Sequence, residues 1–125
     1  MKFSPITIER FRSARHQGFD FQPCVLGLAG NIESGIFILL ALRCDDNRVI
    51  EARFRSFNCI SAVAAGDWVC ERVAGQSLEC AMEIDTDAVD LALGGLPPSR
   101  KFCAGLAETA LHAALSKAQS KAILT

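Results

Sequence analysis

The stretch that decides the fold reads IFILLALRCDDNRVIEARFRSFNCISAVA and spans residues 36–64. Residues 36–43 are apolar and rich in β-forming side chains, and residues 49–57 alternate in part between apolar and polar. Because residues 44–48 are of turn-forming types, the stretch predicts a β-hairpin with a loop of about five residues. Both faces of the first strand are apolar, so we expect helices on one face and a partner or subunit surface on the other.

Helical patterns follow this hairpin. Residues 61–74 carry an apolar face and end before Gly75, which is typical of a helix C-terminus. Two shorter helices fit residues 78–83 and 86–93, and a long amphipathic helix runs from about residue 99 to residue 122. The C-terminal half is therefore expected to be helical.

The residues before the hairpin are less regular. Ser4 and Pro5 form a favourable helix start, although the alternation of Ile6 and Ile8 also fits a strand. Residues 16–35 contain four glycines without a clear period and predict a loop. Strands that precede a run of helices predict an α+β fold: a small antiparallel sheet with a β-hairpin, helices packed on one face and a long C-terminal helix.

Composition limits the class of protein. The 125 residues carry a formal net charge of −1 and half of them are apolar, which fits one domain over residues 1–125 with a single hydrophobic core. Without an excess of basic residues, a nucleic-acid partner is not expected. The apolar runs are too short to span a membrane and the N-terminus lacks the apolar core of a signal peptide, so we expect a cytoplasmic protein without a membrane partner.

Cysteine usage is high. The six cysteines lie at positions 24, 44, 59, 70, 80 and 103. Without an export signal a disulfide framework is not expected, and no C-x-x-C pair is present, so any metal ligands must come from distant segments. Three of the cysteines, Cys44, Cys70 and Cys80, are expected to be small buried hydrophobic residues.

Two cysteines are candidate thiolates. Antiparallel pairing around the hairpin loop places Ser34 beside Cys59, just ahead of the next helix. At a helix N-terminus, exposed N–H groups and the helix dipole favour a thiolate. Cys103 lies near the first turn of the last predicted helix, where the same argument applies more weakly. The alternative is that both thiols are ordinary core residues.

Five segments together have the order and spacing of a known family. They are IERFRSARHQG (8–18), GLAGNIESGI (27–36), RFRSFNCISAVA (53–64), ERVAGQSL (71–78) and LPPSRKFCAGLA (96–107). Nearly the whole chain in this way resembles the IscU/NifU-type iron–sulfur cluster assembly scaffold, including the N-terminal domain of NifU.

The resemblance implies a site of three cysteines and one aspartate that receives sulfur from a cysteine desulfurase and builds a [2Fe–2S] cluster. Cys59 and Cys103 match the second and third cysteines. Ser34 stands in place of the first cysteine and Ile36 in place of the aspartate, while Phe102 occupies a position that is often histidine. Two of the four implied ligands are therefore present.

Several ways to complete the ligand set stay open. Cys24, ten residues before Ser34, could supply a third thiolate beside Cys59 and Cys103. A homodimer could pool the two cysteines of each chain into four thiolates, or a partner protein or small thiol could complete the shell. The alternative is that the fold persists without a metal.

Two classes of function follow. The first is a scaffold or carrier that binds iron, zinc or an iron–sulfur cluster through Cys59 and Cys103, in one chain or across a homodimer. The second is a metal-free interaction module, or a protein that accepts sulfur from a cysteine desulfurase on one reactive thiol.

A partner site is also implied by the resemblance. Leu96, Pro97 and Pro98 resemble the loop that the family's Hsp70-type chaperone binds, although two prolines also simply preset the start of a helix. No Ser-His-Asp set, phosphate-binding loop or H-E-x-x-H motif is present, so the chain is not expected to be an enzyme.

Overall fold

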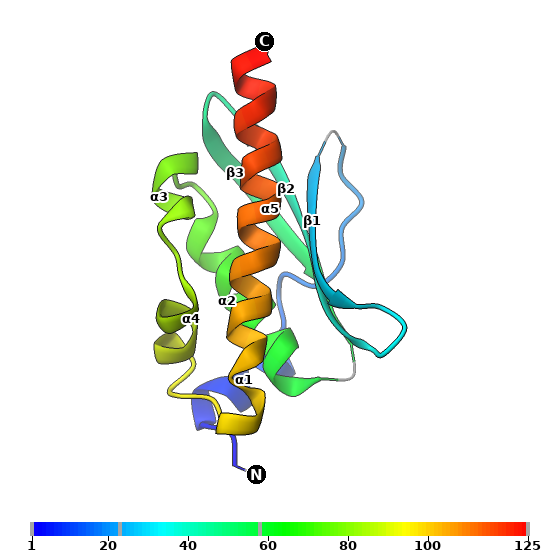
Figure 1. The fold of residues 1–125 in the computed structure, drawn as a ribbon, viewed down its shortest axis with the longest axis vertical. Coiled ribbons are helices and arrows are strands. Elements are labelled where there is room, and N and C mark those ends of the chain that lie inside the picture. The colour runs from blue at the N-terminus through cyan, green and yellow to red at the C-terminus, as the bar shows by residue number, and fades with distance from the viewer. Residues whose placement is uncertain (1, 23, 58, 125) are drawn as a thin grey trace.

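The computed structural model describes residues 2–22, 24–57 and 59–124. Three strands form an antiparallel sheet in the order β1 (Val25–Asn31), β2 (Ile36–Asp45), β3 (Arg48–Arg55). One helix precedes the sheet and the others follow it (Figure 1): α1 (Pro5–Ser13), α2 (Ile60–Val73), α3 (Leu78–Met82), α4 (Thr86–Ala92), the 3₁₀ turn η1 (Pro98–Arg100) and α5 (Phe102–Leu124). The predicted α+β fold, with its antiparallel hairpin and long C-terminal helix, is confirmed.

The β2–β3 hairpin is tighter than its sequence predicts. Its turn consists of Asp46 and Asn47, with φ angles of 54° and 61°. Positive φ at both positions is typical of a type I′ turn, whose twist matches that of the strands, so the expected five-residue loop is wrong. A bulge between residues 43 and 44 then shifts the pairing of β2 with β3. Beyond the bulge Leu39 pairs with Arg55, one residue away from the pairing that the sequence predicts.

Strand β1 corrects the prediction of a loop over residues 16–35. Its residues alternate between buried and exposed, with Val25 and Ala29 facing the core. Gly27 also faces inward, where a Cβ atom would overlap the Ala110 carbonyl oxygen of α5. The glycine that weakens the strand pattern in the sequence is required by the close approach of a helix.

Side-chain caps set the starts of the short helices. The Ser4 hydroxyl accepts a hydrogen bond from the Thr7 N–H at 3.1 Å, and α1 is a helix rather than a strand. Ser77 caps α3 and Asp85 caps α4 in the same way. The last helix starts later than predicted, because residues 98–100 form a separate 3₁₀ turn.

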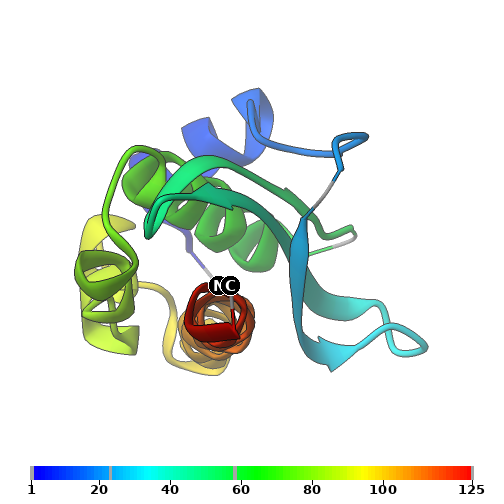
Figure 2. The ribbon, with the colours of Figure 1, turned by 90° about the horizontal axis from the view of Figure 1, so that it is seen from above.

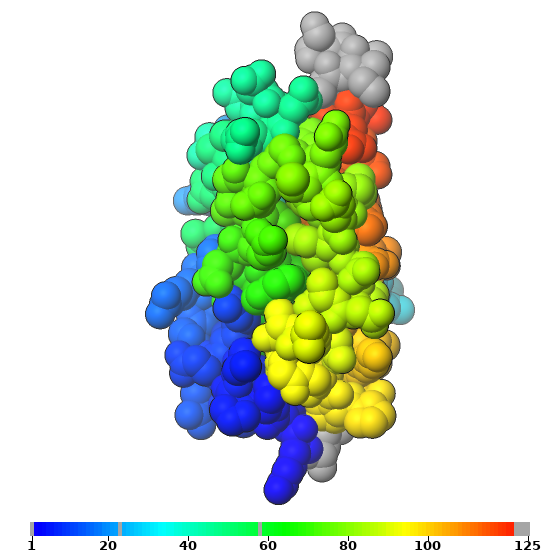
Figure 3. Space-filling view, turned by 90° about the vertical axis from the view of Figure 1, so that its left-hand side faces the viewer, coloured from blue at the N-terminus to red at the C-terminus, as the bar shows by residue number. Residues whose placement is uncertain are grey.

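Helices α2 and α5 cover one face of the sheet, as predicted. Helix α5 contacts β1 and β2 and lies in the concave face of the curved sheet (Figure 2), while α2 contacts β2 and β3. The fully buried Phe54 of β3 packs against Gly66 of α2, where a Cβ atom would lie 2.7 Å from the ring. Helices α3 and α4 lie along one side of the molecule, between the β2–β3 turn and α1 (Figure 3).

A buried carboxylate joins α1 to α2. Asp67 of α2 is 4% exposed and accepts hydrogen bonds from Arg10 Nη1 at 2.9 Å and from the backbone N–H of His16 at 2.9 Å. The His16 ring Nδ1 lies 3.0 Å from the same carboxylate. A charge this deep is retained because it is fully hydrogen-bonded.

The chain itself covers the second face of the sheet at β3. Arg53 of β3 donates to the carbonyl oxygens of Gln17 and Gly18 at 2.9 and 2.8 Å, and the Arg55 guanidinium lies 4.5 Å from the centre of the Phe19 ring. The segment after α1 therefore supplies cover at β3, while Leu26 and Leu28 on the same face of β1 are exposed at 38% and 47%. The partner or subunit surface expected on this face stays a prediction.

Among the residues that the structure describes, no helix is both long enough and apolar enough to span a lipid bilayer.

Candidate functional site

Cys59 is held at the start of α2 by the segment that leaves β3. Buried Ser56 donates from its hydroxyl to the Phe37 carbonyl oxygen at 2.6 Å. The Gln17 side-chain amide bonds both the N–H and the C=O of Ser56, at 3.2 and 2.8 Å. Cys59 then occupies the N-cap of α2 in an extended conformation, at the end of the helix where the backbone N–H groups lack partners within the helix.

Cys103 reaches the same place from the other end of the chain. Leu96 is 7% exposed, and its N–H donates to the Asp90 carboxylate at 2.8 Å. Pro97 and the 3₁₀ turn after it direct the chain into α5, whose second residue is Cys103. Both candidate thiols therefore lie in the first turn or cap of a long helix, as the sequence predicts.

The two sulfur atoms are in contact. Cys59 Sγ and Cys103 Sγ lie 3.8 Å apart, although 44 residues separate them in the sequence. The Ser61 hydroxyl donates to Cys103 Sγ at 3.3 Å and lies 3.5 Å from Cys59 Sγ. Cys59 is 7% exposed, and Cys103 and Ser61 are fully buried.

The contact shifts the pKa values of the two thiols in opposite directions. The hydrogen bond from the Cys103 thiol lowers the pKa of Cys59 against the effect of burial, and the Ser61 hydroxyl and the charge of Arg100 act in the same direction. The same hydrogen bond, followed by burial, raises the pKa of Cys103. The first proton is therefore lost from Cys59, which is also the more exposed sulfur and sits at the helix cap.

The spacing of the sulfurs fits one edge of a tetrahedral metal site. With metal–sulfur bonds of about 2.3 Å, two thiolates on one tetrahedral ion lie about 3.8 Å apart. The observed separation is 3.8 Å, so a metal could bind with little movement of either chain segment. No set of three or more His, Cys, Asp or Glu side chains suited to a metal occurs within residues 2–22, 24–57 and 59–124.

Ser34 is not brought to this pair by any recorded contact. It lies exposed in the turn between β1 and β2, where its hydroxyl donates to the Asn31 carbonyl oxygen at 3.0 Å and accepts from the Ile36 N–H at 3.4 Å. These bonds all lie within its own turn, so Ser34 acts there as a turn residue. Ile36, which stands where the resemblance implies an aspartate, is the half-buried first residue of β2.

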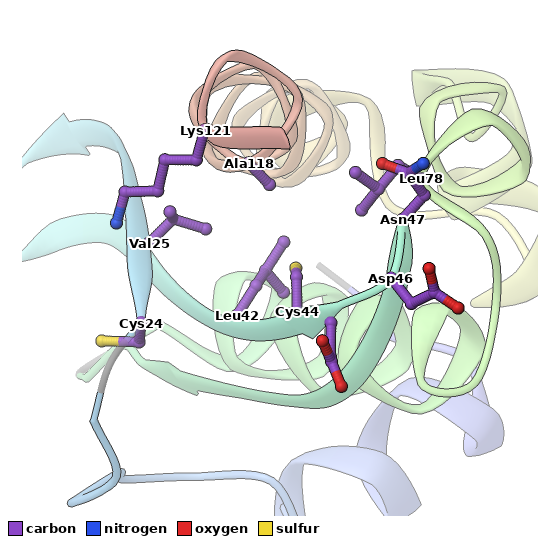
Figure 4. Close-up of a pocket in the computed structure, with 10 residues that line it drawn as sticks. Cys24, Val25, Leu42, Cys44, Asp46, Asn47, Leu78, Ala118 and Lys121 are labelled. Carbon is purple, nitrogen blue, oxygen red and sulfur yellow. The ribbon is translucent and has the colours of Figure 1, made fainter. Parts of the chain in front are cut away.

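Cys24 lies at the wrong end of the sheet to join the pair. It precedes Val25, which pairs with Leu42, whereas the chain leading to Cys59 is anchored at Phe37. Positions 37 and 42 are five residue steps apart along the strand, a distance of about 17 Å. Figure 4 shows Cys24 instead at a pocket shared with Cys44 and Lys121. The suggestion that Cys24 could complete the site in this chain is therefore not supported by the geometry.

The remaining cysteines are only partly as predicted. Cys70 is buried in α2 and Cys44 is half-buried, and burial raises the pKa of both thiols. Cys80 is exposed on α3, so its predicted burial is wrong. A five-residue helix has room for few inward positions, and Leu78 and Ala81 take them.

The proline segment presents only part of itself to solvent. Leu96 is buried in the core, Pro97 is half-buried and Pro98 is exposed. Any partner of this segment would therefore meet Pro98 and the η1 turn rather than the Leu96 side chain.

Sequence reasoning missed Ser61 and Arg100. Ser61 follows Cys59 by two residues, and its orientation toward both sulfurs depends on where α5 docks. Arg100 lies in the turn before α5, and its charge lowers the pKa of both thiols. The sequence did offer a signal for Arg100, because a basic residue three positions before a candidate thiolate favours the thiolate form.

Comparison with known proteins agrees with this architecture. The family described as NifU-like N terminal domain matches residues 3–124, and the chain belongs to this family. It is an IscU/NifU-type protein, and its curated relatives include proteins named iron–sulfur cluster assembly scaffolds.

Individual relatives match over most of their length. The chain is 33% identical over 125 residues to the iron–sulfur cluster assembly scaffold protein IscU of Haemophilus influenzae, covering 97% of this chain and 98% of that one. It is 32% identical over 113 residues to the scaffold protein IscU 1 of Archaeoglobus fulgidus, covering 90% and 74%. The N-terminal part of a nitrogen-fixing NifU-like protein from Brucella abortus superposes with a TM-score of 0.73 at 14% identity, with 94% of each chain covered, which shows the shared fold.

Proposed function

We propose that this protein acts in iron–sulfur cluster assembly by holding a thiophilic cargo, either iron, zinc or an iron–sulfur cluster, on Cys59 and Cys103. The observation that carries the proposal is the contact of the two sulfurs at 3.8 Å, the edge length of a tetrahedral thiolate site. Membership of a family whose curated relatives are named cluster assembly scaffolds supports the same role.

The electrostatics of the pair favour a divalent cation. Two thiolates offset a charge of about +2. Arg100 lowers the pKa of both thiols, and bound metal would replace the proton that Cys59 and Cys103 share. Two protein thiolates leave coordination positions for other ligands, so cargo held here would exchange more readily than cargo in a closed four-ligand site.

A second copy of the chain is one source of the missing ligands. Two pairs of Cys59 and Cys103 related by a two-fold axis would supply four thiolates. The aromatic side chains near the pair are exposed, Phe57 at 51% and Phe102 at 47%, and a second copy would remove this apolar surface from water. The proposed site therefore has two alternative forms, one within a single chain and one bridged across a homodimer.

The proposal extends to the partners and the setting that the resemblance implies. Sulfur would come from a cysteine desulfurase, and an Hsp70-type chaperone would meet the exposed part of the Pro97–Pro98 segment. We propose that residues 1–125 work as one domain, without an enzymatic activity of their own, in the cytoplasm.

Acceptance of sulfur is a second candidate function, favoured by the acidity of Cys59. A persulfide on a donor protein, R–S–SH, would be attacked at its terminal sulfur by the Cys59 thiolate. The products are Cys59–S–SH and the donor thiolate R–S⁻, so no separate oxidant or reductant is needed. The hydrogen bond from Cys103 that lowers the pKa of Cys59 supports this reaction.

Metal content tests the main proposal. Wild type, Cys59→Ala, Cys103→Ala and Cys80→Ala are purified anaerobically after loading with Fe²⁺ or Zn²⁺. We expect wild type and Cys80→Ala, which removes an exposed thiol on α3, to retain metal, and the other two variants to lose it. Equal metal in all four samples would refute the proposal.

Two further measurements resolve the alternatives. Light scattering with and without Zn²⁺ reports whether the metal-bound form is a dimer, and a monomer at full metal loading would exclude the bridged site. Mass spectrometry after incubation with a persulfide donor reports sulfur transfer. A sulfur adduct on Cys59 in metal-free protein supports the second function, and its absence at high donor concentration contradicts it.

A further inference from the structure

The hydroxyl of Ser61 is unusual in having sulfur partners. Ser61 is the second residue of α2 and is fully buried. Buried serine hydroxyls near a helix start normally bond backbone groups. Among the residues that the structure describes, the hydrogen-bond partners recorded for this hydroxyl are the sulfurs of Cys103 at 3.3 Å and Cys59 at 3.5 Å.

The three atoms form a triangle of the size that a tetrahedral ion requires. For metal bonds of about 2.3 Å to sulfur and about 2.0 Å to oxygen, the expected separations are about 3.8 Å between sulfurs and about 3.5 Å between sulfur and oxygen. The observed separations are 3.8 Å for the sulfur pair and 3.3 and 3.5 Å from Ser61 Oγ. A metal in contact with both sulfurs can therefore also take a position within bonding distance of the oxygen.

The charges also suit this donor set. Two thiolates neutralise a divalent cation, and a hydroxyl completes a third position without adding charge, which a buried site favours. A third thiolate in this position would leave a net negative charge. The fourth position is expected on the side of Cys59, since it is 7% exposed whereas the other two donors are fully buried.

We propose that Ser61 Oγ is a metal ligand and that Cys59, Cys103 and Ser61 form a preformed S₂O face for a tetrahedral divalent cation such as Zn²⁺, with the fourth position open. The inference rests on the proposed role of the two cysteines and adds Ser61 as a third donor from the same chain. It concerns the single-chain form of the proposed site, because one open position cannot take both cysteines of a second copy. It also distinguishes Ser61 from Ser34, the serine at which the sequence resemblance places a ligand.

Zinc affinity tests the assignment with a matched pair of serine variants. Ser61→Ala and Ser34→Ala each remove one hydroxyl, and competition with a chromophoric chelator measures the dissociation constant for Zn²⁺. We expect Ser61→Ala to weaken binding by about ten-fold or more, the range seen when metal-site groups are removed. Ser34→Ala should bind as wild type does, because its hydroxyl bonds its own turn.

Spectroscopy of the bound metal gives an independent measurement. X-ray absorption of the Zn²⁺ form should show two sulfur neighbours in wild type and three in Ser61→Cys. With Co²⁺ as the probe, Ser61→Cys should gain thiolate-to-metal charge-transfer intensity over wild type. These readouts use the wild-type structure and a ligand-preserving variant, so they stand even if Ser61→Ala folds poorly.

The outcomes separate the inference from the function on which it rests. Zinc binding by wild type with unchanged affinity in Ser61→Ala overturns Ser61 ligation and leaves the two-cysteine site intact. Two sulfur neighbours in both wild type and Ser61→Cys do the same. Equal and negligible zinc binding by wild type and Cys59→Ala refutes the proposed function, and the assignment of Ser61 falls with it.

Discussion

Replacing Gly27 with alanine tests the packing that brings α5, and with it Cys103, onto the sheet. A Cβ atom at Gly27 would overlap the Ala110 carbonyl oxygen and lie 2.8 Å from Ala114 N, both backbone atoms of α5. Backbone atoms cannot rotate away as a side chain does. The helix must therefore retreat from β1 by about an ångström, or the strand must bend.

The expected cost follows from this overlap. Forcing extra atoms into a packed core costs about 1–3 kcal/mol, and we place Gly27→Ala at about 3 kcal/mol because the obstacle is backbone. The smaller entropy of the unfolded alanine chain offsets about 0.5 kcal/mol. The net loss of unfolding free energy is about 2.5 kcal/mol, equivalent to a fall in Tm of about 10 °C.

A second glycine provides the matched control. Gly105 lies within α5, and a Cβ atom there would have Thr86 Oγ1 at 3.8 Å as its nearest neighbour. Gly105→Ala should stabilise the protein by about 0.5–1 kcal/mol, because alanine is the better helix former. The same chemical change is thus expected to have opposite signs at the two positions.

Urea unfolding followed by circular dichroism measures both variants, with the slope m checking that the unfolded states are comparable. A Gly27→Ala midpoint equal to or above that of wild type would refute the close approach of α5 to β1. Loss of stability in Gly105→Ala would show that α5 has no room for a Cβ atom at this position.

Three other perturbations follow from individual contacts. Asp67→Asn should lower the unfolding free energy by about 2 kcal/mol, since the buried charge-assisted bond from Arg10 is weakened; thermal unfolding measures it, and an unchanged Tm would contradict the account. Cys59 should react with iodoacetamide at a lower pH than an ordinary thiol, and Cys103→Ala should move this profile upward, because the Cys103 hydrogen bond lowers the pKa of Cys59. Because the pKa of Cys59 is lower in the folded than in the unfolded state, its thiolate stabilises the fold above the unfolded pKa, and this contribution is lost as the pH falls through the folded pKa. If Cys103→Ala leaves the dependence of the unfolding free energy on pH unchanged, this account is wrong. Asn47→Gly should stabilise the hairpin by about 0.5 kcal/mol, because φ of 61° suits glycine, and a urea midpoint below that of wild type would count against the type I′ turn.

Local signals explain most of the fold that could be predicted. The alternation and turn residues of the hairpin, the Ser4 and Ser77 caps and the long amphipathic C-terminal segment all act within a few residues of one another. Patterns of this range can be read directly from a sequence. The positions of Cys59 and Cys103 at helix starts were predictable for the same reason.

Strand β1 and the hairpin register lay beyond those signals. Gly27 lowers the strand propensity of its segment, and only the approach of α5 explains why a glycine is needed there. The bulge that shifts the register of β2 against β3 arises from how a two-residue turn joins the strands, and no residue type in the segment predicts it.

By itself, the sequence determined the family, the β2–β3 hairpin with the helices that follow it, and the two cysteines that occupy helix starts, because all of these depend on local pattern and collinear motifs. Tertiary structure alone decided that their sulfurs touch at 3.8 Å, that the Ser61 hydroxyl contacts both of them, and that Cys24 lies at the far end of the sheet. The physical reason is that the docking of α5 against α2 joins segments 44 residues apart, and no local interaction encodes that contact.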